Sequence, residues 1–197
     1  MDTNETRWDR RLKIKTIGRD DTGSDYYRFP YEPTPYPVLE RLAESGLIGA
    51  SNVLIDYGCG KGRVDFFIAR RCNCQTIGIE YNEYIYRQAA GNKQTAVSSS
   101  EVSVICENAE RFDVPTDADR FYFFNPFSVQ IMQKVLTRIL DSWYAVPREI
   151  LLFFYYPSDD YIGYLMQRRE LSYAGEIDCR DLFDGENERE RILIYRI

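Results

Sequence analysis

The chain has 197 residues, a net charge of −6, and 44% hydrophobic and 15% aromatic residues. This length and apolar content fit a single domain with a substantial core, and no apolar run approaches the about 18 residues of a membrane span. Because the polar N-terminus lacks a signal-peptide pattern, we expect a soluble, cytoplasmic protein without membrane contact. The net negative charge disfavours binding to a nucleic-acid backbone.

The chain contains no histidine. This absence removes the usual general base and every Ser-His or Cys-His hydrolase arrangement. The five cysteines form an odd set without paired C-x-x-C spacing, so we expect reduced thiols and no metal site. These cysteines are Cys59, Cys72, Cys74, Cys106 and Cys179.

The first 25 residues are polar and carry several positive charges. The basic side chains are Arg7, Arg10, Arg11, Lys13, Lys15 and Arg19. A basic arm that binds RNA is one interpretation of this run. A solvated face or a frayed terminus explains such a run more often, and it is the interpretation that we favour.

Residues 26–37, here called the strap, alternate aromatic residues with prolines. The aromatic residues are Tyr26, Tyr27, Phe29, Tyr31 and Tyr36, and the prolines are Pro30, Pro33, Pro35 and Pro37. Because proline disrupts regular helix, this composition predicts a stiff, extended segment. Apolar residues at helical spacing then predict a helix over residues 38–47, which ends near Gly46 or Gly49.

A glycine-rich stretch follows the apolar run Val53–Ile55, which predicts a buried strand. The stretch reads Asp56, Tyr57, Gly58, Cys59, Gly60, Lys61, Gly62 and Arg63. A helical pattern over residues 64–71 comes next. In a strand–turn–helix context, glycines allow a sharp turn and a close ligand, and the N–H groups at the helix start favour an anionic group. A plain tight turn is the alternative.

Two well-known nucleotide motifs do not fit this stretch. The dinucleotide fingerprint requires a third small residue at the position of Arg63. The phosphate loop requires a serine or threonine at the position of Gly62. What remains is the pattern D-x-G-x-G-x-G.

The rest of the chain alternates between strand and helix patterns. Further strands are predicted over residues 75–81, 102–106, 120–124 and 149–156, and helices over residues 83–92, 129–140 and 159–168. Two last strands, residues 171–178 and 191–197, have no helix between them and must pair antiparallel. The fold class is therefore α/β: a doubly wound, Rossmann-like sheet of five parallel strands plus a C-terminal antiparallel hairpin, seven strands in all.

The D-x-G-x-G-x-G pattern resembles that of class I S-adenosylmethionine-dependent methyltransferases, and the terminal hairpin is what that family adds to the Rossmann pattern. The resemblance covers roughly residues 30–197 and implies S-adenosyl-L-methionine as the cofactor. It divides the chain into an N-terminal arm and cofactor-covering strap, residues 1–37, and a methyltransferase domain, residues 38–197. It implies cofactor contacts at Asp56, Tyr57, Gly58, Cys59, Gly60 and Gly62.

Glu80 lies at the end of the second expected strand. There a ribose diol can donate two hydroxyl groups to one carboxylate, and the resemblance makes Glu80 the ribose ligand. A cap for the next helix is the alternative role. Asn108 and Ala109 follow the third strand, where the family contacts adenine, with Glu107 as an alternative.

The strap contains Tyr31-Glu32-Pro33-Thr34, which resembles a stretch that closes over the cofactor in several methyltransferases. The resemblance therefore implies cofactor contacts for Tyr31 and Thr34. A strap that only packs over one edge of the core is an equally good interpretation. Aromatic rings such as those of Tyr31, Tyr57 or Phe127 could face the sulfonium.

The fourth strand ends in Asn125-Pro126-Phe127, where the family places its substrate-side motif. N-methyltransferases that act on planar nitrogens carry an Asn/Asp/Ser-Pro-Pro-aromatic motif there, and this chain has one proline instead of two. The resemblance implies that Asn125 accepts a hydrogen bond from the acceptor, with Pro126 in the motif and Phe127 stacking on the substrate. The alternative is that Asn125-Pro126 only ends the strand and starts the next helix.

These features predict S-adenosylmethionine-dependent methyl transfer to a small-molecule or compact side-chain acceptor, with a planar nitrogen among the candidates. No residue stands out as a general base. Nucleic acid is disfavoured because the chain has little more than the catalytic fold, is acidic, and lacks the second proline of enzymes that methylate flipped bases.

Three alternatives to this function stay open. They are an RNA or DNA N-methyltransferase, a non-catalytic S-adenosylmethionine-binding module and an NAD(P)-dependent oxidoreductase. The last is disfavoured by Arg63 and by the absence of a Tyr-x-x-x-Lys pair. The sequence settles neither the acceptor nor the oligomeric state.

Overall fold

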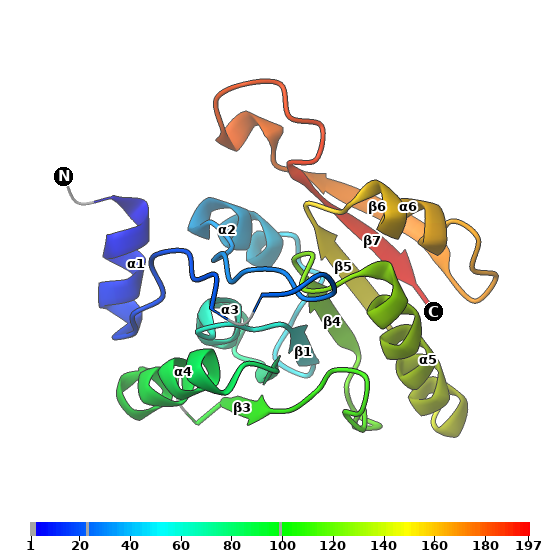
Figure 1. The fold of residues 1–197 in the computed structure, drawn as a ribbon, viewed down its shortest axis with the longest axis horizontal. Helices are drawn as coiled ribbons and strands as arrows, with labels where there is room; N and C mark the ends of the chain where they lie inside the picture. Colours follow the sequence, from blue (N-terminus) through cyan, green and yellow to red (C-terminus); the bar gives the residue numbers. More distant parts are fainter. Residues whose placement is uncertain (1–2, 23, 99) are drawn as a thin grey trace.

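A single mixed sheet forms the centre of the protein (Figure 1). The structure is a computed structural model that describes residues 3–22, 24–98 and 100–197. Its strands are β1 (Val53–Tyr57), β2 (Gln75–Glu80), β3 (Val102–Cys106), β4 (Arg120–Phe123), β5 (Leu151–Tyr155), β6 (Ser172–Asp178) and β7 (Arg191–Arg196). They lie in the order β3-β2-β1-β4-β5-β7-β6.

The pairing of the strands confirms the predicted fold class. Strands β1 to β5 pair in parallel, while β7 pairs antiparallel with both β5 and β6. Because the strand order reverses between β1 and β4, the loops after these strands open into a crevice at their carboxyl ends, the usual ligand site of such sheets.

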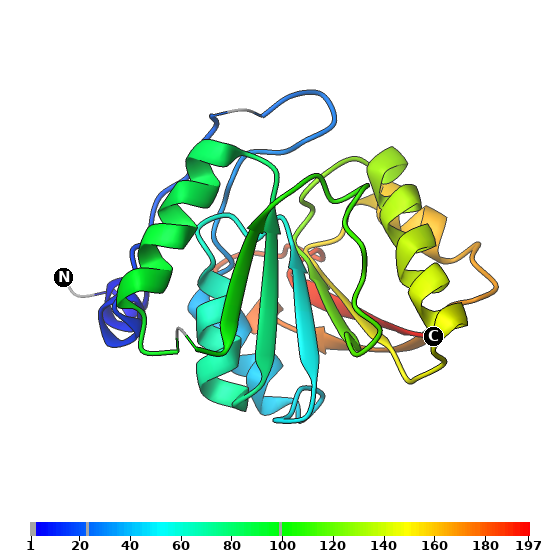
Figure 2. The ribbon, with the colours of Figure 1, turned by 90° about the horizontal axis from the view of Figure 1, so that it is seen from below.

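Helices cover both faces of the sheet. They are α1 (Asn4–Leu12), α2 (Tyr36–Glu44), α3 (Arg63–Cys72), α4 (Glu83–Thr95), α5 (Val129–Ala145) and α6 (Asp159–Leu165). Figure 2 shows α1 to α4 on one side of the sheet and α5 with α6 on the other. Two hydrophobic cores follow from this arrangement, one on each face.

The central strands are buried on both faces, which explains their nearly unbroken apolar sequence. In β4, Phe121 and Phe123 pack against the α5 side, while Tyr122 packs against the α2 and α3 side. In β5, Phe154 faces α5 and α6, and its ring stacks on that of Phe123 at 4.8 Å.

The expectation of a frayed terminus is wrong for residues 4–12, which form α1. The expected solvated face is present, since the basic side chains Arg7, Arg10, Arg11, Lys13, Lys15 and Arg19 are all exposed. Thr3 caps this helix by accepting a hydrogen bond from the Thr6 N–H, and Lys13 ends it in a left-handed conformation. Trp8 and Leu12 are buried in the core shared with α2 and α3, and the Trp8 ring packs edge-on against Phe67 at 4.9 Å. The predicted division of the chain at residues 37 and 38 stays a prediction.

The helix boundaries differ modestly from the predicted ones. Helix α2 begins at Tyr36, two residues earlier than expected, because proline is well tolerated in a first helical turn and Pro37 stands there. Helices α4 and α5 run three and five residues further than predicted, to Thr95 and Ala145. Among the described residues, no helix is long and apolar enough to cross a membrane.

Candidate active site

The glycine loop between β1 and α3 lies at the centre of the crevice. Gly58, Gly60 and Gly62 have φ values of 75°, 57° and 84°, the left-handed region that favours glycine. A Cβ atom on Gly58 would overlap Pro126, and one on Gly60 would overlap the Tyr31 ring. The sequence therefore needs glycine at these two positions because the strap and the loop after β4 press directly on the turn.

Glu80 ends β2 beside this loop. Its carboxylate accepts hydrogen bonds from the Gly60 N–H at 3.0 Å and from the Asn82 N–H at 2.8 Å. Burial raises the pKa of Glu80, while these backbone bonds oppose the rise. The two N–H groups fix the carboxylate at the pocket wall, where its remaining lone pairs can accept further hydrogen bonds.

Two further carboxyl groups lie buried beneath the loop. Asp56 is the last residue but one of β1 and lines the pocket, and Asp65 lies in the first turn of α3. Burial and the nearby charge of Glu80 raise the pKa of Asp56 to about 8. Burial and the charge of Asp56 raise the pKa of Asp65 well above its usual range. The Cys59 thiol lies beside them. Burial is the largest cause of its raised pKa, and the charges of Asp65 and Asp56 raise it further.

The raised pKa of Asp56 predicts a pH-dependent stability. Folded Asp56 keeps its proton up to about pH 8, whereas the unfolded chain loses it near the ordinary value of 3.8. The folded state therefore binds more protons in this window, and the free energy of unfolding falls as the pH rises. Asp56→Asn should gain stability relative to the wild type between pH 5 and pH 8, by at most about 1.4 kcal/mol per pH unit.

Urea unfolding at several pH values measures this difference. The matched control is Asp141→Asn, since Asp141 is exposed on α5. The control should follow the wild-type curve. Parallel curves for Asp56→Asn and wild type would show that Asp56 is ionised in the folded protein at pH 5.

The strap lies over the pocket and contacts both of its sides. The Phe29 N–H donates to the Pro126 carbonyl at 3.3 Å, and Arg28 forms an isolated antiparallel bridge with Phe127. On the other side, the Arg28 guanidinium stacks on the Tyr81 ring at 4.2 Å. The Tyr31 hydroxyl donates to the Thr16 carbonyl at 2.6 Å. A strap held at both sides can separate the pocket from solvent.

Arg63 joins the N-terminal segment to the glycine loop. Its side chain is 2% exposed and lies at the first residue of α3. It donates to the Thr16 hydroxyl at 2.7 Å and to the Thr34 carbonyl at 3.1 Å, and it forms an ion pair with Glu5. Asp9, also buried, lies 3.9 Å from the same guanidinium.

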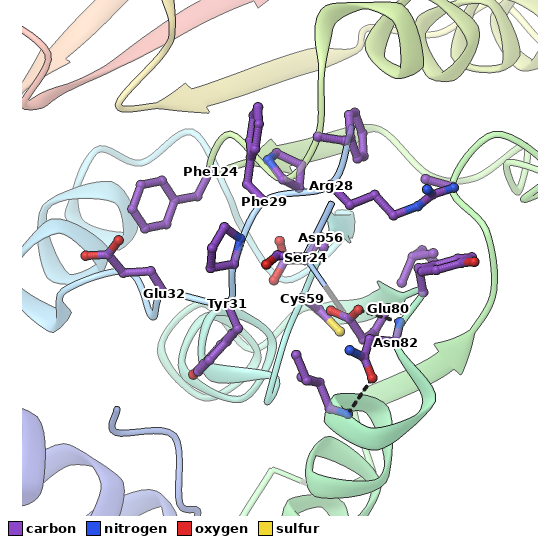
Figure 3. A pocket seen from close by; sticks show the side chains of 18 of the residues that line it. Ser24, Arg28, Phe29, Tyr31, Glu32, Asp56, Cys59, Glu80, Asn82 and Phe124 are labelled. Atoms are coloured by element: carbon purple, nitrogen blue, oxygen red, sulfur yellow. Dashed lines mark hydrogen bonds between the residues drawn. The ribbon is translucent and has the colours of Figure 1, made fainter. Parts of the chain in front are cut away.

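The structure brings most of the predicted site residues to one pocket. Its walls include Tyr31, Thr34, Asp56, Gly58, Cys59, Glu80, Asn108, Ala109, Pro126 and Phe127. Figure 3 shows Glu80 and Asn82 on one side of this pocket and Phe124 with Glu32 on the opposite side. Their roles toward a cofactor stay predictions.

Four predicted residues lie elsewhere. The Tyr57 ring is buried in the core on the α5 side, stacked on Phe123 at 5.2 Å, so it does not face the pocket. Gly60 lies beneath Tyr31, and Gly62 caps α3. Asn125 lines a second cavity rather than this pocket.

The amide of Asn125 is engaged with the loop after β5. Its nitrogen donates to the Tyr156 carbonyl, and its oxygen accepts from the Ser158 N–H at 3.2 Å. The role of Asn125 as hydrogen-bond acceptor for a substrate stays a prediction, since the structure gives this amide a local function that ties β4 to β5. Phe127 packs edge-on against Phe123, and its carbonyl accepts from the Tyr161 hydroxyl at 2.6 Å.

Sequence reasoning missed several residues of the pocket. Arg28, Phe29, Arg63, Tyr81, Tyr122, Phe124 and Ile131 also line it. For Phe29 and Arg28 a signal existed, because both belong to the strap that was expected to cover the site. For Arg63 the sequence offered none, since its partners lie far away in the chain.

Comparisons with known proteins agree with this arrangement. Residues 54–149 match the family model described as a methyltransferase domain. A curated protein-lysine N-methyltransferase from Saccharolobus islandicus (strain REY15A) is 29% identical over 86 residues. That match covers 43% of this chain and 53% of the relative, so the chain spans about half the length of the relative it matches.

Solved structures show the same fold at low sequence identity. An RNA methyltransferase from Salinibacter ruber, in complex with S-adenosyl-L-homocysteine, has a TM-score of 0.56 and 21% identity, over 84% of this chain and 92% of the other. A protein of the NADB-Rossmann superfamily from Streptococcus agalactiae has a TM-score of 0.61 and 16% identity, over 84% of this chain and 69% of the other.

The methyltransferase-domain match over residues 54–149 and this fold support the predicted class, the class I S-adenosylmethionine-dependent methyltransferases. They also support S-adenosylmethionine as the cofactor. Among the described residues, no group of three Cys, Asp or Glu side chains could hold a metal ion.

Proposed function

We propose that this protein transfers a methyl group from S-adenosylmethionine to a small molecule or a compact side chain. The observation that carries the proposal is the pocket under the strap, with the Glu80 carboxylate fixed in its wall by the Gly60 and Asn82 N–H groups. S-adenosylmethionine supplies a methyl group that its sulfonium has already activated. The protein therefore needs mainly to align the reactants and to exclude water.

The chemistry of the pocket fits a cationic cofactor with a ribose. Glu80 supplies a carboxylate, and one oxygen of Asp56, which keeps its proton up to about pH 8, is buried without a hydrogen-bond partner among the described residues. In this proposal Glu80 accepts hydrogen bonds from the ribose, while Asn108 and Ala109 contact the adenine. Tyr31 and Thr34 border the opposite end and exclude water as part of the strap.

The acceptor is proposed to be a compact side chain or a small molecule. The curated relative is named for lysine methylation of proteins, which makes a lysine amino group the first acceptor to test. RNA is the second candidate, because a structural neighbour is named as an RNA methyltransferase and because α1 carries Arg7, Arg10 and Arg11. The acidic net charge of the chain favours the first candidate.

Methyl transfer from labelled S-adenosylmethionine tests both candidates. The purified protein is incubated with a lysine-containing peptide pool, a pool of small amines or total RNA, and Glu80→Ala serves as the inactive control. We expect label in the peptides or amines and none in RNA. Label in RNA, with an affinity that falls steeply with salt, would instead establish the RNA activity. Tight cofactor binding without labelled product in any pool would favour a non-catalytic binding module.

A further inference from the structure

A second cavity adjoins the pocket under the strap. It has a volume of about 390 Å³, within the roughly 300–1,000 Å³ of most ligand sites. Phe29, Pro30, Glu32 and Phe124 line both spaces. The two cavities therefore share a wall that contains Phe124 and Glu32, and these two residues lie across the first pocket from Glu80 in Figure 3.

Aromatic rings at the ends of β4 and β5 form one wall of this cavity. The rings of Phe124 and Tyr155 lie 4.7 Å apart, and those of Phe124 and Tyr156 lie 6.3 Å apart in an edge-on arrangement. Tyr156 has a φ of 51°, which is costly for a bulky residue and requires support from its surroundings. Its hydroxyl accepts from the Asn187 amide at 2.9 Å, so the ring is held in a fixed position.

Three charged side chains line the cavity: Arg19, Glu32 and Glu190. The Tyr155 hydroxyl donates to one oxygen of the Glu190 carboxylate at 2.7 Å. Over the described ranges, no lysine or arginine forms an ion pair with Glu190, whereas neighbouring Glu188 pairs with Arg180 at 2.7 Å.

The two nearby arginines are directed elsewhere. Arg19, which also lines the cavity, pairs with Asp21 at 2.8 Å. Arg189 donates to the carbonyls of Pro157 and Tyr156 and lies over the Tyr156 ring at 4.4 Å. A second acid, Glu32, is exposed at the junction of the two cavities. The cavity is thus aromatic, with an anionic group that lacks a cation.

We propose that the second cavity binds the methyl acceptor as an alkylammonium group, with Glu190 as its counter-ion. Aromatic faces attract cations, and a carboxylate forms charge-assisted hydrogen bonds with an ammonium. The inference rests on the proposed function and names the substrate class of that site. A lysine side chain and a free alkylamine share this chemistry.

The chemical step balances with water as the proton acceptor. The ammonium first loses one proton to solvent water. The nitrogen lone pair then forms a bond to the methyl carbon, the carbon–sulfur bond breaks, and its electron pair stays on sulfur. The products are a methylated ammonium and the neutral thioether of S-adenosylhomocysteine.

Amine binding can be measured separately from methyl transfer when the protein carries S-adenosylhomocysteine, which has no methyl group to transfer. The protein is loaded with S-adenosylhomocysteine and titrated by calorimetry with Nα-acetyl-lysine amide, n-butylamine or Nα-acetyl-norleucine amide, the uncharged analogue. We expect the amines to bind and the norleucine derivative to bind at least tenfold more weakly. Glu190→Gln should weaken amine binding by roughly 10–100-fold and leave the affinity for S-adenosylhomocysteine unchanged.

Two controls make the result specific. Glu188→Gln removes an exposed carboxylate outside the cavity and should bind amines like the wild type. Tyr155→Phe should weaken binding less than Glu190→Gln, because it removes only the group that orients the carboxylate. Tighter binding of Nα-acetyl-lysine amide would identify the ligand as a lysine side chain, and tighter binding of n-butylamine would identify it as a free amine.

Equal binding of the lysine and norleucine derivatives, or an unchanged affinity in Glu190→Gln, would overturn the inference. These outcomes differ from a failure of the proposed function. Amine binding without methyl transfer would support the cavity and contradict the activity. Methyl transfer to another acceptor, together with absent amine binding, would support the activity and contradict the cavity.

Discussion

Glu80→Ala is expected to weaken the binding of S-adenosylhomocysteine roughly 5–150-fold. In the proposed role of Glu80, the change removes the carboxylate that accepts hydrogen bonds from the ribose, at a cost of about 1–3 kcal/mol. It also leaves the Gly60 and Asn82 N–H groups without their present partner. Calorimetric titration of the folded variant measures the loss.

Two companion variants separate the causes of that loss. Glu80→Gln keeps one oxygen and the shape of the side chain, so it should retain part of the affinity. Glu83→Ala removes an exposed acid of α4 that pairs with Arg87 and should bind like the wild type. An unchanged affinity in a folded Glu80→Ala protein would remove Glu80 from the cofactor site.

Arg63→Met is expected to lower the free energy of unfolding by about 3–5 kcal/mol, the usual loss when one partner of a buried ion pair is removed. The variant leaves buried Asp9 without its positive neighbour and frees the Thr34 carbonyl and the Thr16 hydroxyl from their donor. Because Arg63 links α1 and the strap to the glycine loop, α1 should also become less protected against hydrogen exchange. Urea unfolding measures the first effect, and exchange measures the second.

Arg71→Met is the matched control on the same helix. Its guanidinium pairs with exposed Glu44 and is 37% exposed, so the loss should stay within about 1 kcal/mol. A similar loss in both variants would mean that the buried network around Arg63 contributes no more than a surface pair.

The parts of the site that depend on local pattern were predictable from the sequence. The glycine loop and Glu80 follow directly from buried strands, and parallel strands bring their carboxyl ends to one edge of the sheet. The face of the sheet on which the Tyr57 ring lies could also have been predicted from the sequence. Side chains alternate along a strand, so Tyr57 must share a face with Ile55, opposite to Asp56.

The parts that depend on distant contacts were not predictable. The α1 helix has an ordinary polar sequence, and it is the burial of Trp8 and Leu12 against α2 and α3 that stabilises it. Arg63 meets Glu5 across 58 positions of the chain. The second cavity is formed by the strap, the ends of β4 and β5, and the segment before β7. No local sequence pattern predicts that these segments meet.

The way in which the strap is held bears on how fast the enzyme can exchange its nucleoside. Its backbone bonds join Phe29 to Pro126 and Tyr27 to Ser128 on one wall, while Arg28 rests on Tyr81 at the other. If the strap covers the bound nucleoside, as the resemblance predicts, the nucleoside leaves only after these contacts break. That opening is a unimolecular event whose rate does not depend on the acceptor concentration, so it sets an upper limit on turnover even when the chemistry at the methyl group is fast.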